Sequence, residues 1–154
     1  MIEINRTTNY PVDRKKITLL AARFLRLYKR SRFSVSLALV GAARIKTLNY
    51  RYRRTPRATD VLSFPAAGSA LIKNYLGEII INTNELKKPY KYQAMFKEIG
   101  LDFSSLKKQK KYRDYLLYFL LVHGLLHLVG YDDKTEPERL RMLQRGRDFL
   151  RRVV

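Results

Sequence analysis

The sequence predicts an α+β fold, in which a mixed sheet of about four strands packs with four to five helices. Three observations predict it. Short alternating apolar segments, typical of strands, are interleaved with longer segments of helical periodicity. The chain has 154 residues, 46% of them hydrophobic, which suffices for one hydrophobic core. Neither an internal repeat nor a linker-like composition divides it, so we expect residues 1–154 to form a single domain.

The N-terminal part predicts two strands and two helices. Residues 1–5 alternate Ile2 and Ile4 with polar neighbours, as in a short strand. Asp13 precedes a segment of helical periodicity that extends to Tyr28, and its position is typical of a helix start. Residues 33–40 alternate as a second strand, which Gly41 ends, and residues 42–52 then predict a second helix.

The central part predicts two further strands. Residues 61–64 form the first, and Pro65 either stops it or marks an edge strand. After a loop of small residues at 66–74, residues 76–82 contain three consecutive isoleucines, which indicates burial on both faces. Thr83 or Asn84 is expected to cap a following helix. Between 87 and 111 the sequence is basic and irregular, and predicts one helix fragment at 92–99 and a loop.

The C-terminal part predicts two helices. Residues 112–129 are the most apolar segment of the chain and contain both of its histidines. The sequence Thr-Glu-Pro-Glu at 135–138 is typical of a helix start, with proline and acids in the first turn. The apolar stretch 116–129 is shorter than the roughly 20 residues that span a bilayer, so we expect no membrane segment.

Charge and composition limit the function classes. The net charge of +19 favours a polyanionic partner, and nucleic acid is the obvious candidate. The alternatives are a merely basic soluble surface or one that meets an acidic membrane. The chain has no cysteine, which excludes disulfides and thiol catalysis and suits a reducing compartment. The N-terminus lacks the layout of a signal peptide, and we expect a cytoplasmic protein.

The two histidines predict a metal site. His123 and His127 are four residues apart, so on a helix both imidazoles project from one face, about 6 Å apart. Neutral imidazole binds zinc and similar ions well. After Gly130 the chain can turn back and bring Asp132 or Asp133 to the same metal. The simpler interpretation is that the histidines are hydrogen-bonded core residues. Gly124 replaces the glutamate of the H-E-x-x-H motif, which argues against a metalloprotease of that kind.

The stretch from His123 to Asp132 closely resembles the signature H-G-x-L-H-L-x-G-Y-D-H of the YbeY family, bacterial endoribonucleases and rRNA maturation factors. Three other segments agree with that family in order and spacing. They are Leu48-Asn49 with Tyr52-Arg53, the stretch Thr59-Asp-Val-Leu-Ser-Phe-Pro65, and Leu76-Gly-Glu-Ile79. The resemblance therefore covers nearly the whole chain.

The resemblance implies one Zn²⁺ ion bound by His123, His127 and the residue at 133, with water in an open position. In the family that third ligand is histidine, whereas this chain has Asp133. Aspartate can bind zinc through oxygen, but its charge lowers the net charge of the site and should leave bound water less acidic. The site is thus expected to be weaker, or to prefer another metal.

The resemblance also implies that Arg53 and His123 are catalytic. A guanidinium beside the metal can clamp a phosphate through two hydrogen bonds and stabilise its developing charge. Arg51 and Arg54 flank Arg53 in a basic segment and are further candidates for substrate binding. Thr59 and Asp60 are expected to orient that loop through side-chain hydrogen bonds to the backbone.

The first functional hypothesis is a metal-dependent, single-strand-specific endoribonuclease. It would act in rRNA maturation, at the 3′ end of small-subunit rRNA, and in ribosome quality control, in contact with the ribosome or its small subunit. The second is a non-catalytic RNA- or ribosome-binding maturation factor with a structural metal, which the Asp133 substitution favours. A third, a metal hydrolase of small or peptide substrates, leaves the net charge of +19 unexplained.

Overall fold

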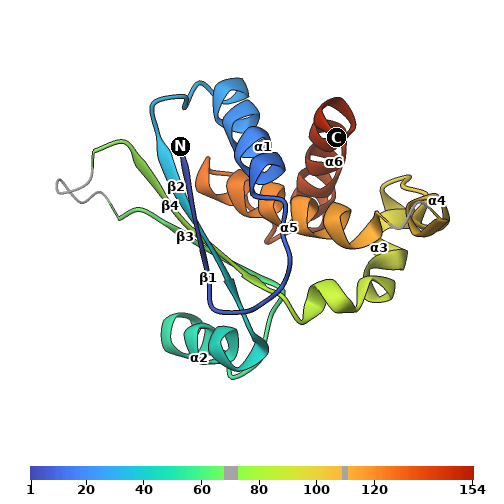
Figure 1. Cartoon of the computed structure of the whole chain (residues 1–154), viewed down its shortest axis with the longest axis horizontal. Coiled ribbons are helices and arrows are strands. Elements are labelled where there is room, and N and C mark those ends of the chain that lie inside the picture. Colours follow the sequence, from blue (N-terminus) through green and yellow to red (C-terminus); the bar gives the residue numbers. More distant parts are fainter. Residues whose placement is uncertain (68–72, 109–110) are drawn as a thin grey trace.

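Four strands form one mixed sheet in the order β1-β2-β4-β3 (Figure 1). The computed structural model describes residues 1–67, 73–108 and 111–154. The strands are β1 Ile2–Arg6, β2 Ser34–Val40, β3 Val61–Pro65 and β4 Tyr75–Asn82. β1, β2 and β4 are parallel, while β3 runs antiparallel to β4 at the edge of the sheet. The prediction of an α+β fold with a four-stranded mixed sheet is confirmed, and Pro65 does lie on an edge strand.

Within the described ranges the chain has six α-helices and two short 3₁₀ helices. The α-helices are α1 Arg14–Leu27, α2 Ala42–Arg53, α3 Gln93–Glu98, α4 Phe103–Lys108, α5 Tyr112–Leu128 and α6 Glu136–Val153, and the 3₁₀ helices are Glu85–Lys87 and Pro89–Tyr92. Two predicted starts are confirmed. Asp13 caps α1 by accepting a hydrogen bond from the Lys16 amide, and Thr135 forms a capping box with Glu138.

Two predictions for the middle of the chain are wrong, and a third concerns residues that the structure describes only in part. α4 was expected to be a loop; it has only six residues and none is buried, so it carries too few apolar positions to reveal a period. Neither expected cap is formed, since the Thr83 hydroxyl donates to the Val40 carbonyl and Asn84 makes no capping bond. The expected loop 66–74 lies partly outside the described residues.

The helices lie on two sides of the sheet. α1, α5 and α6 cover one face, and α2 covers the other (Figure 1). Successive side chains of a strand point to opposite faces, so Ile79 and Ile81 join the large core while Ile80 packs in the smaller cluster with Ile45 of α2. The predicted burial of the three isoleucines on both faces is confirmed.

α5 is the central helix of the large core. It packs on β3 and β4 and also contacts α1, α4 and α6. Leu116, Leu121 and Leu125 are fully buried along it, which explains why this segment is the most apolar in the sequence. No described helix, α5 included, combines the length and apolar character needed to cross a bilayer.

Candidate metal centre

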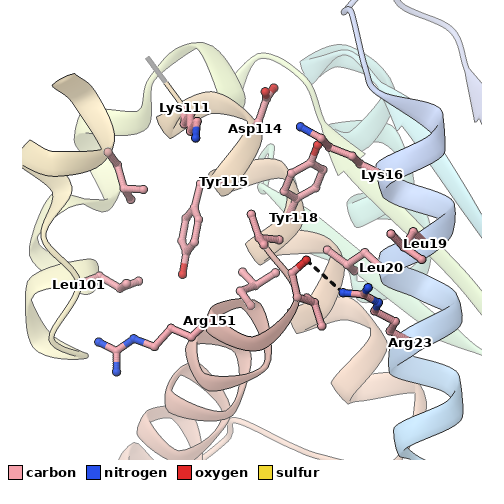
Figure 2. Close-up of a pocket in the computed structure, with 14 residues that line it drawn as sticks. Lys16, Leu19, Leu20, Arg23, Leu101, Lys111, Asp114, Tyr115, Tyr118 and Arg151 are labelled. Carbon is pink, nitrogen blue, oxygen red and sulfur yellow. Dashed lines mark hydrogen bonds between the residues drawn. The ribbon is translucent and has the colours of Figure 1, made fainter. Parts of the chain in front are cut away.

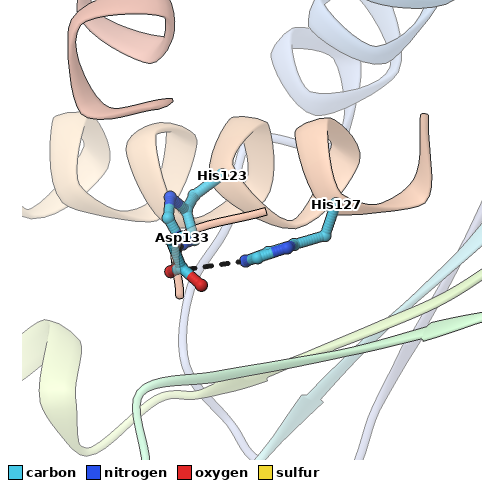
Figure 3. A group of neighbouring side chains, drawn as sticks. All are labelled: His123, His127 and Asp133. Carbon is cyan, nitrogen blue, oxygen red and sulfur yellow. Dashed lines mark ion pairs between the residues drawn. The ribbon is translucent and has the colours of Figure 1, made fainter. Parts of the chain in front are cut away.

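Both histidines extend from α5 on the side where the strands lie (Figure 3). Helix and sheet meet closely at Gly124, where a Cβ atom would lie 2.7 Å from Cγ2 of Ile79 on β4. A larger residue would push α5 away from the sheet. Packing therefore accounts for glycine at the position where a metalloprotease helix carries glutamate.

The turn after α5 brings a carboxylate back to the histidines. Gly130 has a φ of +100°, a conformation that favours glycine, and its amide donates to the His127 carbonyl at 3.0 Å. The next residue, Tyr131, is held by its ring, which packs edge-on against Tyr28 and lies under the Arg145 guanidinium. The chain then reverses, and Asp133 comes to lie beside the two imidazoles (Figure 3).

Asp132 is engaged elsewhere. One of its carboxylate oxygens accepts a hydrogen bond from the Asp133 amide at 2.8 Å, and the other pairs with the Lys134 ammonium at 3.0 Å. Of the two aspartates that the sequence offered, the structure thus brings Asp133 to the histidines. The role of Asp133 as a metal ligand stays a prediction.

The spacing of the three side chains fits one metal ion. Oδ2 of Asp133 lies 3.3 Å from Nε2 of His123 and 3.6 Å from Nε2 of His127. Two ligands bound at about 2.0–2.2 Å to a tetrahedral zinc ion lie about 3.3–3.6 Å apart. The donor atoms of all three residues lie within 4.8 Å of one another. The donor set and its geometry therefore suit a zinc-like divalent ion.

The protonation states also suit metal binding. Nδ1 of His127 lies 3.1 Å from the Tyr131 carbonyl oxygen, which can only accept, so Nδ1 carries the proton and Nε2 keeps its lone pair. Burial, with the neighbouring His123, lowers the pKa of His127 below its ordinary value. A hydrogen bond from His123 lowers the pKa of Asp133 against the opposing effect of burial. At neutral pH the centre thus offers a neutral His127 imidazole and a carboxylate.

The three side chains line a cleft of about 440 Å³ together with Arg53. Arg53 is the last residue of α2, which packs on the opposite face of the sheet from α5, and it lines the cleft beside residues 59–61 at the start of the edge strand β3. The structure therefore brings together Arg53, His123, His127 and Asp133 from three separate segments. Arg51 and Arg54 are exposed neighbours of Arg53 and do not line this cleft.

A hydrogen-bond network fixes the wall of the cleft near Arg53. One oxygen of Asp60 accepts from the Val61 amide at 2.8 Å, and the other accepts from the Tyr92 hydroxyl at 3.0 Å. The Asn82 side chain donates to the Thr59 carbonyl at 3.1 Å. The side-chain to backbone bond expected of Asp60 is therefore present, and both of its carboxylate oxygens are occupied. The bond expected of Thr59 is not, because its hydroxyl donates to the Asp60 carboxylate at 3.3 Å and not to the backbone.

Two polar lining residues, Ser63 and Lys134, were not singled out from the sequence. Ser63 lies on β3 between Leu62 and Phe64, and its buried hydroxyl has no hydrogen-bond partner in the described part of the chain. The strand alternation could have placed it on the α5 side, since Leu62 and Phe64 pack on the α2 side. Lys134 follows Asp133 directly, but only the turn after α5 brings it to the cleft.

A second cavity, of about 470 Å³, lies between α1, the start of α5 and the end of α6 (Figure 2). Its lining is mostly apolar, with Tyr115 and Tyr118 facing it and Lys16, Arg23 and Arg151 around it (Figure 2). It contains none of the residues that the sequence predicts to be functional. We therefore assign the candidate site to the cleft at Asp133.

Fold and site together define an α+β protein with a candidate three-ligand metal centre in a cleft that Arg53 also lines. The sequence model of the family described as Endoribonuclease YbeY matches residues 3–154. This chain belongs to the YbeY family.

Individual relatives agree with the family match. The Endoribonuclease YbeY of Halalkalibacterium halodurans is 33% identical over 140 residues, which cover 84% of this chain and 77% of the relative. That of a Geobacillus strain is 37% identical over 127 residues, which cover 77% of this chain and 71% of the relative. That of an Anaeromyxobacter strain is 28% identical over 137 residues, 89% of this chain, but this match spans only 63% of the relative.

The fold is similar to a solved structure. The solution structure of TM1509 from Thermotoga maritima matches with a TM-score of 0.58 and 22% identity, covering 99% of this chain and 89% of that one. At this identity the match supports the architecture and carries no argument about activity.

Proposed function

We propose that this chain is a metal-dependent endoribonuclease that cleaves single-stranded RNA in the cytoplasm. Its place would be rRNA maturation, at the 3′ end of small-subunit rRNA, and ribosome quality control, in contact with the ribosome or its small subunit. The observation that carries the proposal is one cleft lined by a His₂Asp group and by Arg53. The named activity of the relatives and the net charge of +19 support RNA as the substrate.

The donor set favours a catalytic rather than a structural metal. Structural zinc sites are closed by four protein ligands, whereas catalytic sites keep a position open. The group here has three candidate ligands, and the nearby carboxylates Asp60 and Asp132 are engaged in other bonds. A divalent ion held by His123, His127 and Asp133 would supply Lewis acidity toward a phosphoryl oxygen or toward water.

The residues of the chain have distinct roles in this proposal. Arg53 forms no ion pair with a described carboxylate, so both arms of its guanidinium can donate to a phosphate in the cleft. Those hydrogen bonds strengthen as negative charge develops on the phosphoryl oxygens. His123 and His127 would hold the metal in the same cleft, while Arg51 and Arg54 would bind neighbouring phosphates of the RNA strand.

Asp133 is the observation that favours a second candidate, a non-catalytic maturation factor with a structural metal. A carboxylate in place of a neutral histidine lowers the net charge of the metal centre, which weakens its pull on water and phosphate. In that case the same residues would bind metal and RNA without cleaving it.

Cleavage of single-stranded RNA by the purified protein separates the two candidates. We expect cleavage by the wild type, with metal present by elemental analysis, and loss of cleavage in His123→Ala and Arg53→Ala. Retained metal and RNA binding without cleavage would favour the maturation factor. Activity that survives His123→Ala would exclude the metal mechanism. Replacement by the family's residue, Asp133→His, should raise zinc affinity if position 133 is a ligand.

The pH dependence of zinc affinity tests the ligands directly. The pKa of His127 is lowered, so its imidazole stays neutral at pH 7 and protons compete with zinc only below its ordinary value of about 6.5. The pKa of Asp133 is lowered as well, so it remains ionised throughout this range. Competition with a fluorescent chelator should therefore give a nearly constant affinity between pH 8 and 7 and a fall below about 6.5. A steep fall between pH 8 and 7 would contradict this assignment.

A further inference from the structure

The segment 44–57, which ends at the cleft, combines exposed cations with exposed aromatic rings. It contains six basic residues, Arg44, Lys46, Arg51, Arg53, Arg54 and Arg57, and no acid. All six are exposed, and none pairs with a carboxylate among the residues that the structure describes. Tyr52, directly before Arg53, is 59% exposed. Alternating cations and aromatic rings are the composition of surfaces that bind single-stranded nucleic acid.

Two contacts hold the Tyr52 ring in place. Its centroid lies 5.1 Å from that of Phe64, with the planes inclined by 59°, and the Arg51 guanidinium lies 5.6 Å from it. An inclined contact does not cover the ring as a parallel stack would, which agrees with its high exposure. Tyr52 is therefore a fixed and largely exposed aromatic surface, and Arg51 places a positive charge over its ring.

The position of Tyr52 relative to the cleft follows from the edge strand. Phe64, which Tyr52 contacts, follows Ser63 on β3, and Ser63 lines the cleft. Consecutive residues of a strand are about 3.8 Å apart and point to opposite faces. β3 pairs only with β4 in the described sheet, so its outer edge is free. The Tyr52 ring and the cleft thus lie on the two faces of one edge strand.

We infer that Tyr52 is a stacking site for an unpaired base of RNA, one that flanks the phosphate bound at Arg53. The RNA strand passes around the outer edge of β3, with one phosphate at Arg53 in the cleft, the neighbouring base on the Tyr52 ring and the next phosphate at Arg51 or Arg54. This inference rests on the proposed function for its substrate class. It adds a reason for single-strand preference, because the bases of a duplex are already stacked on one another.

Equilibrium binding of a labelled single-stranded RNA of about twelve nucleotides to the full chain, without added metal, tests this site independently of cleavage. Tyr52→Ala should weaken binding between about 5- and 150-fold, the range for loss of one stacked base. Tyr52→Phe keeps the ring and should bind like the wild type. Tyr90→Ala, which removes a tyrosine of 65% exposure outside segment 44–57, is the matched control and should have no effect.

Three further measurements separate stacking from packing and from charge. Tyr52→Leu refills the space against Phe64 without an aromatic face, so it should bind as weakly as Tyr52→Ala. The dependence of affinity on salt should be the same for Tyr52→Ala as for the wild type, since no cation is lost. Duplex RNA should bind the wild type and Tyr52→Ala with equal affinity.

The inference is overturned if Tyr52→Leu binds like the wild type, or if duplex affinity falls as much as single-strand affinity. Wild-type affinity for the single strand in Tyr52→Ala would overturn it too. Failure of the proposed function gives a different result, because an inactive protein that binds RNA through Tyr52 would still show the stacking effect.

Discussion

Two basic regions of this molecule use the same residue type in opposite ways. Segment 44–57, at the end of α2, and helix α6 each contain six basic residues. In α6 three of the six arginines form ion pairs or hydrogen bonds within the protein. Arg139 pairs with Glu98 and Glu136, both at 2.6 Å, Arg147 pairs with Asp148 and donates to the Ile99 carbonyl, and Arg151 donates to the Gly100 carbonyl.

In segment 44–57 the cations have no such partners. Its only buried side chains on α2 are Ile45 and Asn49, and none of its cations pairs with a described carboxylate. Arg139, Arg147 and Arg151 join α6 to residues 98–100, whereas the cations of 44–57 have no described carboxylate partner and can bind an anion. The difference teaches that the number of basic residues in a region does not indicate how many of its cations are available to bind an anion.

The largest expected effect is on cleavage. Arg53→Ala should lower kcat about 10²–10³-fold, the usual loss when one charge-stabilising donor is removed, and change the free energy of unfolding by less than about 0.5 kcal/mol. Arg147→Ala is the control from α6. It should leave the cleavage rate of the folded protein unchanged but cost about 1–2 kcal/mol of stability, because the Ile99 carbonyl loses its donor. If Arg53→Ala and Arg147→Ala lowered the cleavage rate equally, the proposed difference in role between segment 44–57 and α6 would be wrong.

Two glycines test how closely α5 packs against its neighbours: Gly124 faces Ile79 of the sheet, and Gly146 of α6 faces Phe119 of α5. Gly124→Ala places a methyl group 2.7 Å from Ile79 Cγ2 in a buried contact, and should lower the free energy of unfolding by about 1–3 kcal/mol. Gly146→Ala, on α6, places its methyl 3.6 Å from the Phe119 ring, an ordinary contact, and should raise stability by about 0.4–1 kcal/mol. Urea denaturation of both variants measures this. A stabilising Gly124→Ala would show that helix and sheet are less closely fitted than described.

A smaller effect is expected from the ion pairs of α6. Arg139→Ala should cost at most about 1 kcal/mol of stability, since the pairs with Glu98 and Glu136 are partly exposed, and lower Tm by roughly 2–4 °C. Arg44→Ala, which removes a cation without a described carboxylate partner, should leave Tm unchanged. Thermal unfolding at low salt compares the two variants. A larger loss of Tm for Arg44→Ala than for Arg139→Ala would contradict the stabilising role of the Arg139 ion pairs.

The smallest effect concerns the salt dependence of RNA binding. Arg54→Ala should reduce the slope of log affinity against log salt by about 0.7, the value for one phosphate contact on a single strand. Arg141→Ala, which removes an exposed arginine of α6, should leave the slope unchanged. Titrations with single-stranded RNA at several salt concentrations measure both slopes. If the two variants change the slope equally, RNA binding is not confined to segment 44–57.

The predictability of the elements depended on how local their signals were. The capping residues Asp13 and Thr135 and the long apolar period of α5 located helices α1, α5 and α6 correctly, because caps and periodicity act within a few residues. α4 was missed because six residues are too few to show a period. The alternation of residues 61–64 predicted β3. It could also have indicated that the Ser63 side chain lies on the α5 side of the sheet, opposite to Leu62 and Phe64.

The sequence by itself determined the α+β class, the helix that carries His123 and His127, and the family resemblance, since each depends on residues near one another in the chain. The tertiary structure decided which residues share a cleft. Asp133 reaches the histidines only because Gly130 and the held Tyr131 reverse the chain, and Arg53 shares their cleft only because α2 ends beside the start of β3. It also decided which arginines are occupied, since Arg139 pairs with Glu98, 41 positions earlier in the chain, whereas Arg53 has no described carboxylate partner. Such long-range pairing has no local pattern and becomes visible only when the helices are packed on the sheet.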